Sequence, residues 1–402
     1  MREGWKLVRL GEVTKITRDR IDPRELEASH ELIHYSIPAL DATGGPEAAR
    51  AGSIKSHKFK VETDGVAISM LNPRIPRSVL INGSNSTVCS TEFAVLRPST
   101  NELSIAYLNL VAMWPEFNGY LSRSAKGTTG SRKRSNAADV SAFKVLLPPL
   151  PEQHRIVDLI GSLDEAIEAA DDATSAISHL LLAAREAIPA GEEIALGELL
   201  EGIDSGVSVV TPNELATELE PQVLKLSAVK PGFFVPEEAK ALSGAFLPER
   251  ARLHEGDLLM TRANTPDRVG YVCVARGVRP ESYMPDLVWR LLVDTSFVSV
   301  DFLEQVLSST EIRRRVTATA TGTSSSMKKI SKAKVATVLI PVPLADEQAA
   351  YVRLTQAIES ERSACEDYAA SLRHLRTNLL TALLSGTHEI PVSYDDQLPE
   401  AV

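Results

Sequence analysis

Two stretches of the sequence are copies of one another, and they decide how the chain is organised. Residues 127–153 read GTTGSRKRSNAADVSAFKVLLPPLPEQ, and residues 322–348 read GTSSSMKKISKAKVATVLIPVPLADEQ. The two align without gaps at a spacing of 195 residues and are identical at nine of 27 positions. The same register continues to Gly191 and Gly386, and Leu10-Gly11-Glu12 recurs as Leu196-Gly197-Glu198. We therefore interpret the chain as a tandem duplication.

Each copy begins with a region in which short apolar runs alternate with Gly and Pro. Runs of four to eight residues rich in Val, Ile and Leu are typical of strands. They occupy residues 65–71, 92–98, 256–262, 269–275, 287–293 and 335–341. Helical stretches are expected near residues 103–121 and 300–316. The fold class predicted for each globular domain is therefore α/β (mixed α+β).

Each copy ends in a long amphipathic helix. In the first, apolar residues recur at alternating spacings of four and three from Ile156 to Ile188. In the second, the assigned positions are Tyr351, Leu354, Ile358, Glu361, Cys365, Tyr368, Leu372, Leu375, Leu379 and Ala382. Sustained heptads are typical of coiled coils. A single amphipathic helix more often packs on its own domain, but two matched helices in one chain favour pairing with each other.

Chain order then predicts the geometry of the pair. The first helix leads from domain one to domain two, so the second must run back along it. We expect antiparallel helices of roughly 55 Å and pseudo-twofold symmetry. Pro151 suits the first turn of one helix and Asp346 the N-cap of the other. The expected boundaries are domain 1–150, helix 151–190, domain 191–344, helix 345–390 and a flexible acidic tail 391–402.

The charge is unevenly distributed along the chain. The whole sequence of 402 residues has a net charge of −10 and only 5% aromatic residues, which argues against a simple nucleic-acid binder. However, the two helices and the tail carry −12, whereas the two domains together carry +2. The acidity therefore belongs to the predicted helices, and the domains remain compatible with a polyanionic partner.

Both domains contain a basic loop at the same place in the repeat. Hydroxyl groups and backbone N–H groups can donate to phosphate oxygens, and Lys and Arg add a salt-dependent attraction. A solvated surface loop is the alternative, and recurrence in both copies weakens it. The first loop contains Arg123, Lys126, Thr128, Thr129, Ser131, Arg132, Lys133 and Arg134. Its counterpart contains Arg313, Arg314, Arg315, Thr323, Ser324, Ser325, Lys328, Lys329, Lys332 and Lys334.

Candidate readers of base edges follow one predicted strand in each domain. Arg and Asn are the side chains that pair with guanine and adenine in the major groove. An exposed loop side chain is an equally good interpretation of each. The candidates are Asn72, Arg74 and Arg77 in the first domain, and Arg262, Asn264 and Arg268 in the second.

Several chemistries find no support in the sequence. Cys89, Cys273 and Cys365 lie far apart, which indicates free thiols and no metal site. We find no phosphate-binding GxxxxGK[ST] loop, HExxH or GxSxG, so we expect no enzymatic activity and no cofactor of the chain's own. Because no apolar leader or membrane-spanning run is visible, a cytoplasmic protein without membrane contact is expected.

These features together resemble the specificity subunit of Type I restriction–modification systems. The resemblance rests on WKLVRLGEV (residues 5–13), the repeated G-T-[TS]…P-x-x-x-E-Q junction and the heptad helices. It implies a non-catalytic reader of double-stranded DNA in which each domain is a target recognition domain for one half of a bipartite site. It also implies that the helices set the spacer and dock two methyltransferase subunits, with restriction subunits as further partners. AdoMet, ATP and Mg²⁺ would belong to those partners.

Two other functions stay open at this point. A protein-binding scaffold without direct DNA readout would also use acidic helices and few aromatic residues. An enzyme with an unfamiliar site is a third hypothesis, which the absent motifs argue against. The bases that are read and the spacer length do not follow from the sequence.

Overall fold

The chain is represented by a computed structural model that describes residues 4–127, 132–209, 215–217, 220–242, 247–322 and 327–397. The candidate residues Thr128, Thr129, Ser131, Thr323, Ser324 and Ser325 lie outside the described residues. Two compact units divide the chain: unit 1 comprises residues 1–170 and 367–402, and unit 2 comprises residues 171–366. Each unit is described by itself.

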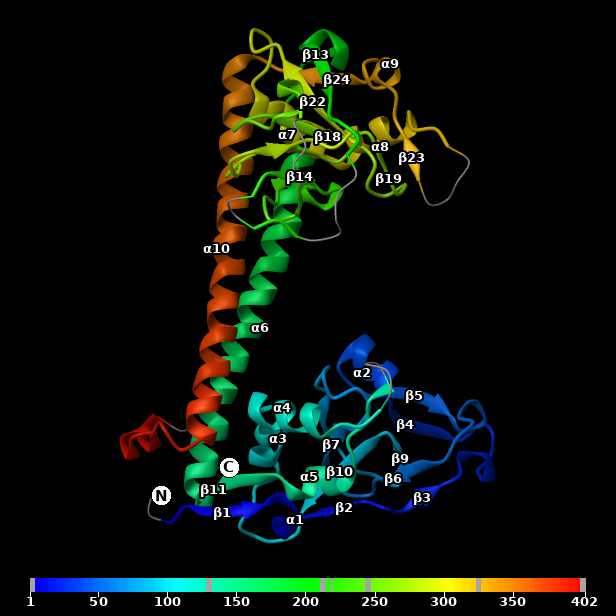
Figure 1. The fold of residues 1–402 in the computed structure, drawn as a ribbon, viewed down its shortest axis with the longest axis vertical. Helices are drawn as coiled ribbons and strands as arrows, with labels where there is room; N and C mark the ends of the chain where they lie inside the picture. The colour runs from blue at the N-terminus through cyan, green and yellow to red at the C-terminus, as the bar shows by residue number, and fades with distance from the viewer. Residues whose placement is uncertain are drawn as a thin grey trace. The chain divides into compact units, whose positions relative to one another are not determined.

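Unit 1 is built on a four-stranded antiparallel sheet in the order β2-β10-β7-β8 (Figure 1). All five residues of β7 are buried, which explains the continuous apolar run in the sequence. Two helices, α3 and α4, pack on this sheet through a core that includes Tyr107, Phe117 and Leu96. The bounds are β2 Thr14–Ile16, β7 Gly65–Ser69, β8 Ser78–Ile81, β10 Phe93–Pro98, α3 Ile105–Met113 and α4 Pro115–Ser124.

A second sheet of unit 1 has five strands in the order β3-β6-β9-β4-β5. A two-stranded pair, β1-β11, lies at the start of the long helix α6 (Figure 1). The strands are β1 Lys6–Arg9, β3 Arg20–Ile21, β4 Glu31–Tyr35, β5 Glu47–Arg50, β6 Lys58–Lys60, β9 Thr87–Ser90 and β11 Lys144–Leu147. The short helices are α1 Leu10–Val13, α2 Ile37–Thr43 and α5 Ala137–Ala142.

Unit 2 repeats the principal sheet of unit 1 strand for strand. Its order is β13-β22-β18-β20, and every pair is antiparallel. The bounds are β13 Leu200–Ser205, β18 Leu258–Thr261, β20 Val272–Val274 and β22 Val288–Val293, with helices α7 Val300–Ser308, α8 Thr310–Ala318 and α9 Lys332–Val335. The 195-residue spacing therefore corresponds to equivalent strands and helices, as the duplication predicts.

The remaining strands of unit 2 form smaller sheets. One has the order β17-β14-β21, and the others are the pairs β12-β24, β15-β16 and β19-β23. The bounds are β12 Glu192–Ala195, β14 Gln222–Leu224, β15 Val229–Lys230, β16 Phe233–Phe234, β17 Ala239–Ala241, β19 Ala263–Asn264, β21 Ser282–Tyr283, β23 Lys328–Lys329 and β24 Leu339–Val342. Mixed α/β folding of both domains is confirmed.

The predicted segments differ from the structure at three places. Residues 103–121 form two helices because Pro115 begins α4 and Trp114 before it is extended. Residues 300–316 likewise break at Ser309, whose side chain caps α8 by accepting from the Ile312 N–H. In the predicted strand 335–341, the chain is extended only from Leu339.

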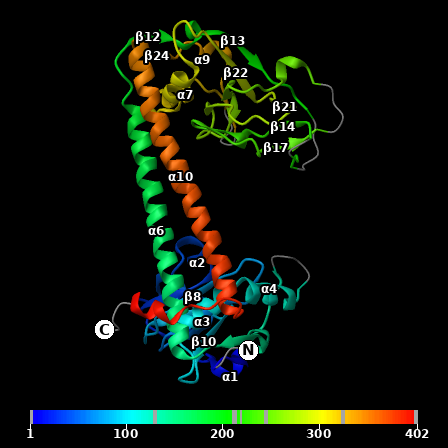
Figure 2. The ribbon, with the colours of Figure 1, turned by 90° about the vertical axis from the view of Figure 1, so that its left-hand side faces the viewer.

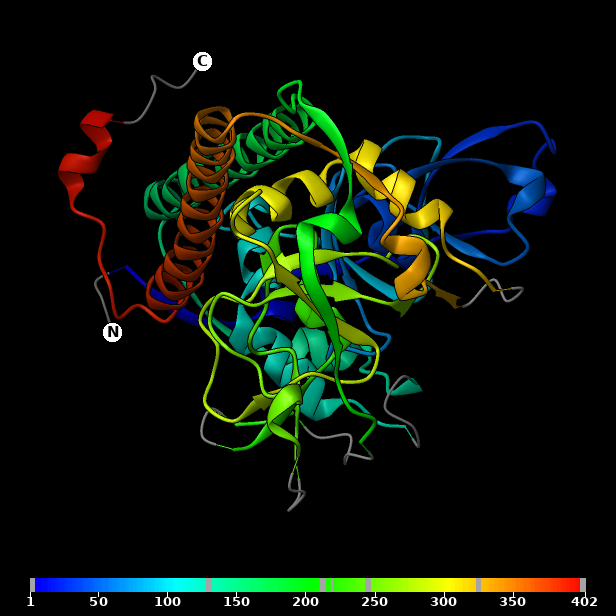
Figure 3. The ribbon, with the colours of Figure 1, turned by 90° about the horizontal axis from the view of Figure 1, so that it is seen from above.

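Helix α7 connects the sheet of unit 2 to a long helix of the same unit. Figure 3 shows it beside α10. The rings of Phe302 and Tyr351 meet edge to face, with their centres 5.7 Å apart. On the sheet side, the buried Glu304 accepts from the Val274 N–H and from Arg276. Burial raises the pKa of Glu304, and Arg276 opposes the rise. The carboxylate thus ties α7 to β20.

The two long helices are α6 (Leu150–Glu186) and α10 (Ala345–Leu384). In unit 1, Arg376 near the end of α10 is paired with Asp164 near the start of α6. In unit 2, the Tyr351 hydroxyl near the start of α10 donates to the Arg185 carbonyl near the end of α6, at 2.8 Å. Within each unit the helices therefore run antiparallel, as Figure 2 shows.

The apolar positions assigned to α10 are only half right. Tyr351, Leu372 and Leu379 are buried or half-buried, but Leu354, Tyr368 and Leu375 are at least 50% exposed. The inward positions between them are Thr355, Arg362, Ala369, Arg376 and Leu383. An apolarity search misses Thr, Arg and Ala at such positions. In α6 every assigned position from Ile156 to Ala184 is buried or half-buried, whereas Ile188 lies beyond the end of the helix at Glu186.

The start of α10 also corrects a prediction. Helix α10 begins at Ala345, so Asp346 lies in its first turn and is not the N-cap. The Glu347 carboxylate accepts from the Leu344 N–H at 3.1 Å, which is one half of a capping box. Pro151 lies in the first turn of α6, as predicted.

The Gln that ends each repeat motif joins a long helix to its own domain. The Gln153 amide donates to the carbonyl oxygens of Glu102 and Pro148 and accepts from the Ser104 N–H, all within 2.7–2.8 Å. In unit 2, Gln348 donates to the carbonyls of Phe297 and Pro343 at 3.1 and 3.0 Å. Both side chains are buried. The conserved spacing of the P-x-x-x-E-Q motif in both copies therefore has a structural role, because its Gln fastens each long helix to the domain before it.

All three cysteines are free thiols, as predicted. Cys89 and Cys273 are buried and Cys365 is half-buried. Burial raises the pKa of Cys89 to about 12 and also raises that of Cys273.

We expect Gln153→Leu to lower the free energy of unfolding of unit 1 by about 3 kcal/mol, because it leaves three buried backbone groups without partners. Urea unfolding in a Trp289→Phe background would measure it, since Trp5 and Trp114 both lie in the core of unit 1. The exposed neighbour His154 provides the control variant His154→Ala, which should change stability by less than about 0.5 kcal/mol. Equal effects of the two substitutions would contradict the joint.

Candidate nucleic-acid interface

In each unit the described residues on either side of the repeated basic loop pair with each other as the two arms of a hairpin. Lys126 bridges Arg134 in unit 1, and Thr321 bridges Lys329 at the equivalent place in unit 2. Gly127 and Gly322 have φ values of 150° and 138°, and a Cβ at either would approach a backbone carbonyl at 2.9–3.1 Å. Both hairpins thus use glycine at the same position for the same steric reason.

The loop after a central strand lies directly against each hairpin. In unit 1 the Asn72 N–H donates to the Lys133 carbonyl at 2.8 Å. In unit 2, Asn264 in β19 pairs with Lys328 in β23. The structure therefore brings together two groups of candidates that the sequence places about 60 residues apart.

The unit 1 candidates differ in availability. Arg77 is bound by Asp41 through two hydrogen bonds of 2.6 and 2.9 Å, and its side chain is only 13% exposed, so it has a structural partner. Arg134 pairs with Glu92 at 2.7 Å but stays exposed. The remaining basic candidates of this unit are exposed or half-buried: Arg74, Arg123, Lys126, Arg132 and Lys133.

The basic candidates of unit 2 also differ in availability. Arg268 and Arg314 are exposed, each with one neighbouring carboxylate, Asp267 and Glu311 respectively. Other members bond to the protein itself: Lys328 donates to the Gly322 carbonyl, Lys332 to the Ile203 carbonyl, and Arg313 to the Asp267 carbonyl. Arg262 is half-buried and Lys329 is exposed.

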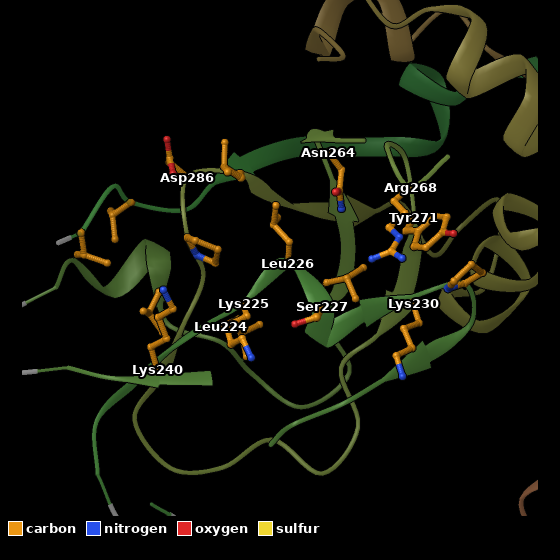
Figure 4. Close-up of a pocket in the computed structure, with 17 residues that line it drawn as sticks. Leu224, Lys225, Leu226, Ser227, Lys230, Lys240, Asn264, Arg268, Tyr271 and Asp286 are labelled. Carbon is orange, nitrogen blue, oxygen red and sulfur yellow. The ribbon is translucent and has the colours of Figure 1, made fainter. Parts of the chain in front are cut away.

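A cavity of about 780 Å³ opens beside these candidates in unit 2 (Figure 4). Asn264 and Arg268 contribute to one rim, and Lys225, Lys230 and Lys240 lie along the other. The apolar lining residues include Val223 and Leu224 of β14 and the nearby Leu226. Asp286 is the one carboxylate among the lining residues that the structure describes. A concave basic surface of this kind suits a polyanion.

Sequence reasoning missed the three lysines of this cavity. Lys225 directly follows β14, Lys230 lies in β15 and Lys240 in β17, so the three are outside the repeated motif and spread over 16 residues. The only signal in the sequence is a comparison of charges in residues 221–241, where lysines outnumber carboxylates. Lys225 is paired with Glu238 at 2.5 Å, whereas Lys230 lies over the Phe233 ring at 5.9 Å.

Unit 1 has its own basic hollow, of about 480 Å³, lined by Arg50, Lys55, Lys58 and His34. Burial lowers the pKa of His34, and the positive charge of Lys58 lowers it further, against the opposing Glu47. Burial also lowers the pKa of Lys58. These residues too were missed from the sequence.

Residues 2–174 match the family model described as Type I restriction modification DNA specificity domain. The curated relative is the Type I restriction enzyme EcoEI specificity subunit of Escherichia coli, 27% identical over 168 residues. The match covers 40% of this chain and 28% of that protein, so the chain spans little more than a quarter of this relative's length.

Two solved structures extend the likeness in fold along the chain. One, from a study of complex assembly and conformational transition of the type I R-M system, has a TM-score of 0.64 and 21% identity, covering 96% of this chain and 98% of that one. The other is the S subunit of a Type I restriction-modification system from M. genitalium, with a TM-score of 0.53 and 13% identity, covering 96% and 97%. The chain is thus similar to Type I restriction–modification specificity proteins in sequence over residues 2–174 and to these two solved structures in fold.

Neither a membrane-spanning helix nor a cluster of metal-ligating side chains occurs among the described residues. None of the helices is both long enough and apolar enough to cross a membrane. In the same part of the chain, no group of three or more His, Cys, Asp or Glu side chains is arranged so that it could hold a metal ion.

Gly232 follows Pro231 of the cavity lining and packs closely on Arg185 of α6. Its φ is +69°, and a Cβ there would lie 2.1 Å from Arg185 Nη2. Gly277 has φ +71° and no atom within 4 Å of its Cβ position, so it is a matched control.

We expect Gly277→Ala to lower the free energy of unfolding of unit 2 by about 1 kcal/mol, because of left-handed backbone strain alone. Gly232→Ala also displaces the buried guanidinium of Arg185, so it should lower the free energy of unfolding by about 2 kcal/mol more. Hydrogen exchange of the β18 and β22 amides would measure both. Equal protection in the two variants would contradict the close packing.

Proposed function

We propose that this chain is the DNA sequence-recognition subunit of a Type I restriction–modification complex. The observation that carries the proposal is the duplicated hairpin with an Asn-containing loop against it, which in unit 2 borders a basic cavity. Each domain, residues 1–150 and 191–344, would read one half of a bipartite site. The domain match and the fold support this, and the chain itself would have no catalytic role.

The candidates divide into two kinds of contact. Exposed Lys and Arg of the hairpins, among them Lys126, Arg132 and Lys329, suit phosphate oxygens and fix position on the duplex. Asn264 and Arg268 suit base edges, because their amide and guanidinium groups match adenine and guanine. Arg77 is an unfavourable reader, since Asp41 already occupies its guanidinium.

The long helices supply the proposed spacer and docking surface. Lengths of 37 and 40 residues make each a rod of roughly 55–60 Å. Helix α10 exposes Leu354, Tyr368 and Leu375, and α6 exposes Leu180 and Leu182. Exposed apolar side chains of this kind suit protein partners, here two methyltransferase subunits and, in a nuclease-active complex, restriction subunits. AdoMet, ATP and Mg²⁺ would be bound by those partners in the cytoplasm.

The same exposed side chains favour the second candidate, a protein-binding scaffold that does not read DNA. The two functions differ in one respect. A scaffold assembles the partner subunits with no preference among DNA sequences, whereas a recognition subunit imposes one.

The hairpin of unit 2 can be tested with Lys328→Ala/Lys329→Ala. We expect weaker binding to all duplexes by a similar factor and a reduction of about two in the slope of log affinity against log salt. Fluorescence anisotropy with the chain co-purified with its methyltransferase subunit would measure both. The control removes two exposed lysines of unit 1, Lys15→Ala/Lys144→Ala. Identical slopes for the test and control variants would remove the hairpin from the interface.

The spacer role can be tested by lengthening both helices by one heptad, after Thr174 in α6 and after Cys365 in α10. Seven residues add about 10 Å, so the preferred spacer should grow by about three base pairs. Selection of bound duplexes from a randomised pool reports both half-sites and the spacer. A variant that still binds with the original spacer would refute this role.

A further inference from the structure

The loop between β19 and β20 carries two of the side chains that line the basic cavity of unit 2. Asn264 ends β19, Arg268 follows four residues later, and both belong to the cavity lining. Figure 4 shows the two side chains on the same side of the cavity. Arg268 is exposed and Asn264 is half-buried, so a large ligand can reach both.

The backbone of this loop is fixed at Arg268. Its N–H donates to the Thr265 carbonyl at 3.0 Å. Its carbonyl accepts from the hydroxyl of Thr261, which is fully buried at the end of β18, also at 3.0 Å. A reading side chain is placed most accurately when its backbone is held by rigid elements. Arg268 therefore leaves the protein from a defined position, although its side chain is exposed.

Arg313 of α8 braces the same loop and does not line the cavity. Its guanidinium lies 4.6 Å from the centre of the Tyr271 ring, and one terminal nitrogen donates to the Asp267 carbonyl at 3.1 Å. These contacts hold the loop on both sides of Arg268. The structure thus gives Arg313, a candidate DNA contact in the sequence, the geometry of a positioning residue.

The two side chains turn hydrogen-bond donors toward a ligand. The Asn264 amide oxygen accepts from the Thr265 N–H at 2.9 Å, which leaves the NH₂ group as the available end of the amide. A guanidinium has donors only. Nε is the nitrogen of Arg268 nearest to Asp267 Oδ2, at 3.3 Å, and the terminal nitrogens form no hydrogen bond with a described residue.

A pair of donors distinguishes between the bases of a duplex. In the major groove guanine presents two acceptors, N7 and O6, and arginine can bond to both. Adenine presents an amino donor beside its single acceptor, cytosine presents an amino donor, and thymine presents one acceptor beside a methyl group. An asparagine reads adenine by accepting as well as donating, and the Thr265 N–H competes for the oxygen that would accept.

We propose that Arg268 and Asn264 read a guanine in the half-site of unit 2. The inference rests on the proposed function, because it requires that unit 2 contacts duplex DNA. Arg268 donates through its two terminal nitrogens to N7 and O6 of the guanine. The NH₂ group of Asn264 disfavours adenine and cytosine, which present an amino group of their own.

Unit 1 lacks this pair of donors. Asn72 occupies the place of Asn264 beside the hairpin. It is followed by Pro73, which has no N–H to hold the amide oxygen. Four residues after Asn72 stands Pro76, in the place of Arg268. The guanine is therefore specific to the half-site of unit 2, and the two half-sites differ in sequence.

The full-length chain, co-purified with its methyltransferase subunit, should be used to select duplexes from a randomised pool. We expect a guanine that Arg268→Gln replaces with adenine, because glutamine bonds to N6 and N7 of adenine. Affinity of this variant for the original duplex should fall about tenfold or more. Asn264→Asp has nearly the same shape but turns an acceptor to the base, so it should lower the preference for guanine over adenine.

The matched control is Arg250→Gln, an exposed arginine of unit 2 outside the cavity lining, which should select the same sequence as the unaltered chain. Loss of folding weakens binding to every duplex and does not exchange one base for another. If Arg268→Gln weakens all duplexes equally and selects the original sequence, Arg268 is a phosphate contact and the reading pair is overturned, while the proposed function stands. If the unaltered chain selects no sequence, the proposed function is overturned as well.

Discussion

The buried side-chain amide at the start of each long helix is the interaction on which the arrangement depends. Gln153 bonds to the Glu102 carbonyl and the Ser104 N–H, which lie about 50 residues earlier in the sequence. It also bonds to the Pro148 carbonyl, just before its own helix. A helix joined to a domain by a flexible peptide could point anywhere. An amide with three fixed partners sets the direction in which the helix leaves, and Gln348 repeats this with two. Any function that uses the helices as a measure of length relies on these joints.

The two units share their sheet order and hairpin, but they differ in the side chains that they bury on the long helices. Both units have the same sheet order and the same hairpin with glycine at its base. On the long helices, however, unit 1 buries Leu380, Leu383 and Leu384 of α10, whereas unit 2 buries Arg185 of α6 near Glu359 of α10. An apolar contact tolerates small shifts, but a buried guanidinium needs particular partners. The polar contact of unit 2 therefore fixes one alignment of α6, α7 and α10.

Much of the fold was predictable because its signals are local. The buried strand Gly65–Ser69 is apolar throughout, and the repeat located equivalent elements in both units. The register of α10 was not predictable in the same way: Thr355 and Arg362 face inward while Leu354 and Tyr368 face solvent. Tertiary packing overrides apolarity there. The cavity lysines were missed because strand pairing, which the sequence does not display, brings Lys225 and Lys240 to one rim.

The antiparallel helices also determine when each unit can fold during synthesis. Unit 2 is one continuous segment of chain, residues 171–366, so all its parts emerge from the ribosome in succession. Unit 1 is completed by residues 367–402, and its core includes Leu380, Leu384 and Ile390 together with Ile156 from the start of α6. The first domain to be made therefore waits, with part of its apolar surface uncovered, until the second has been translated. Unit 1 is therefore the first to begin synthesis and the last to be completed.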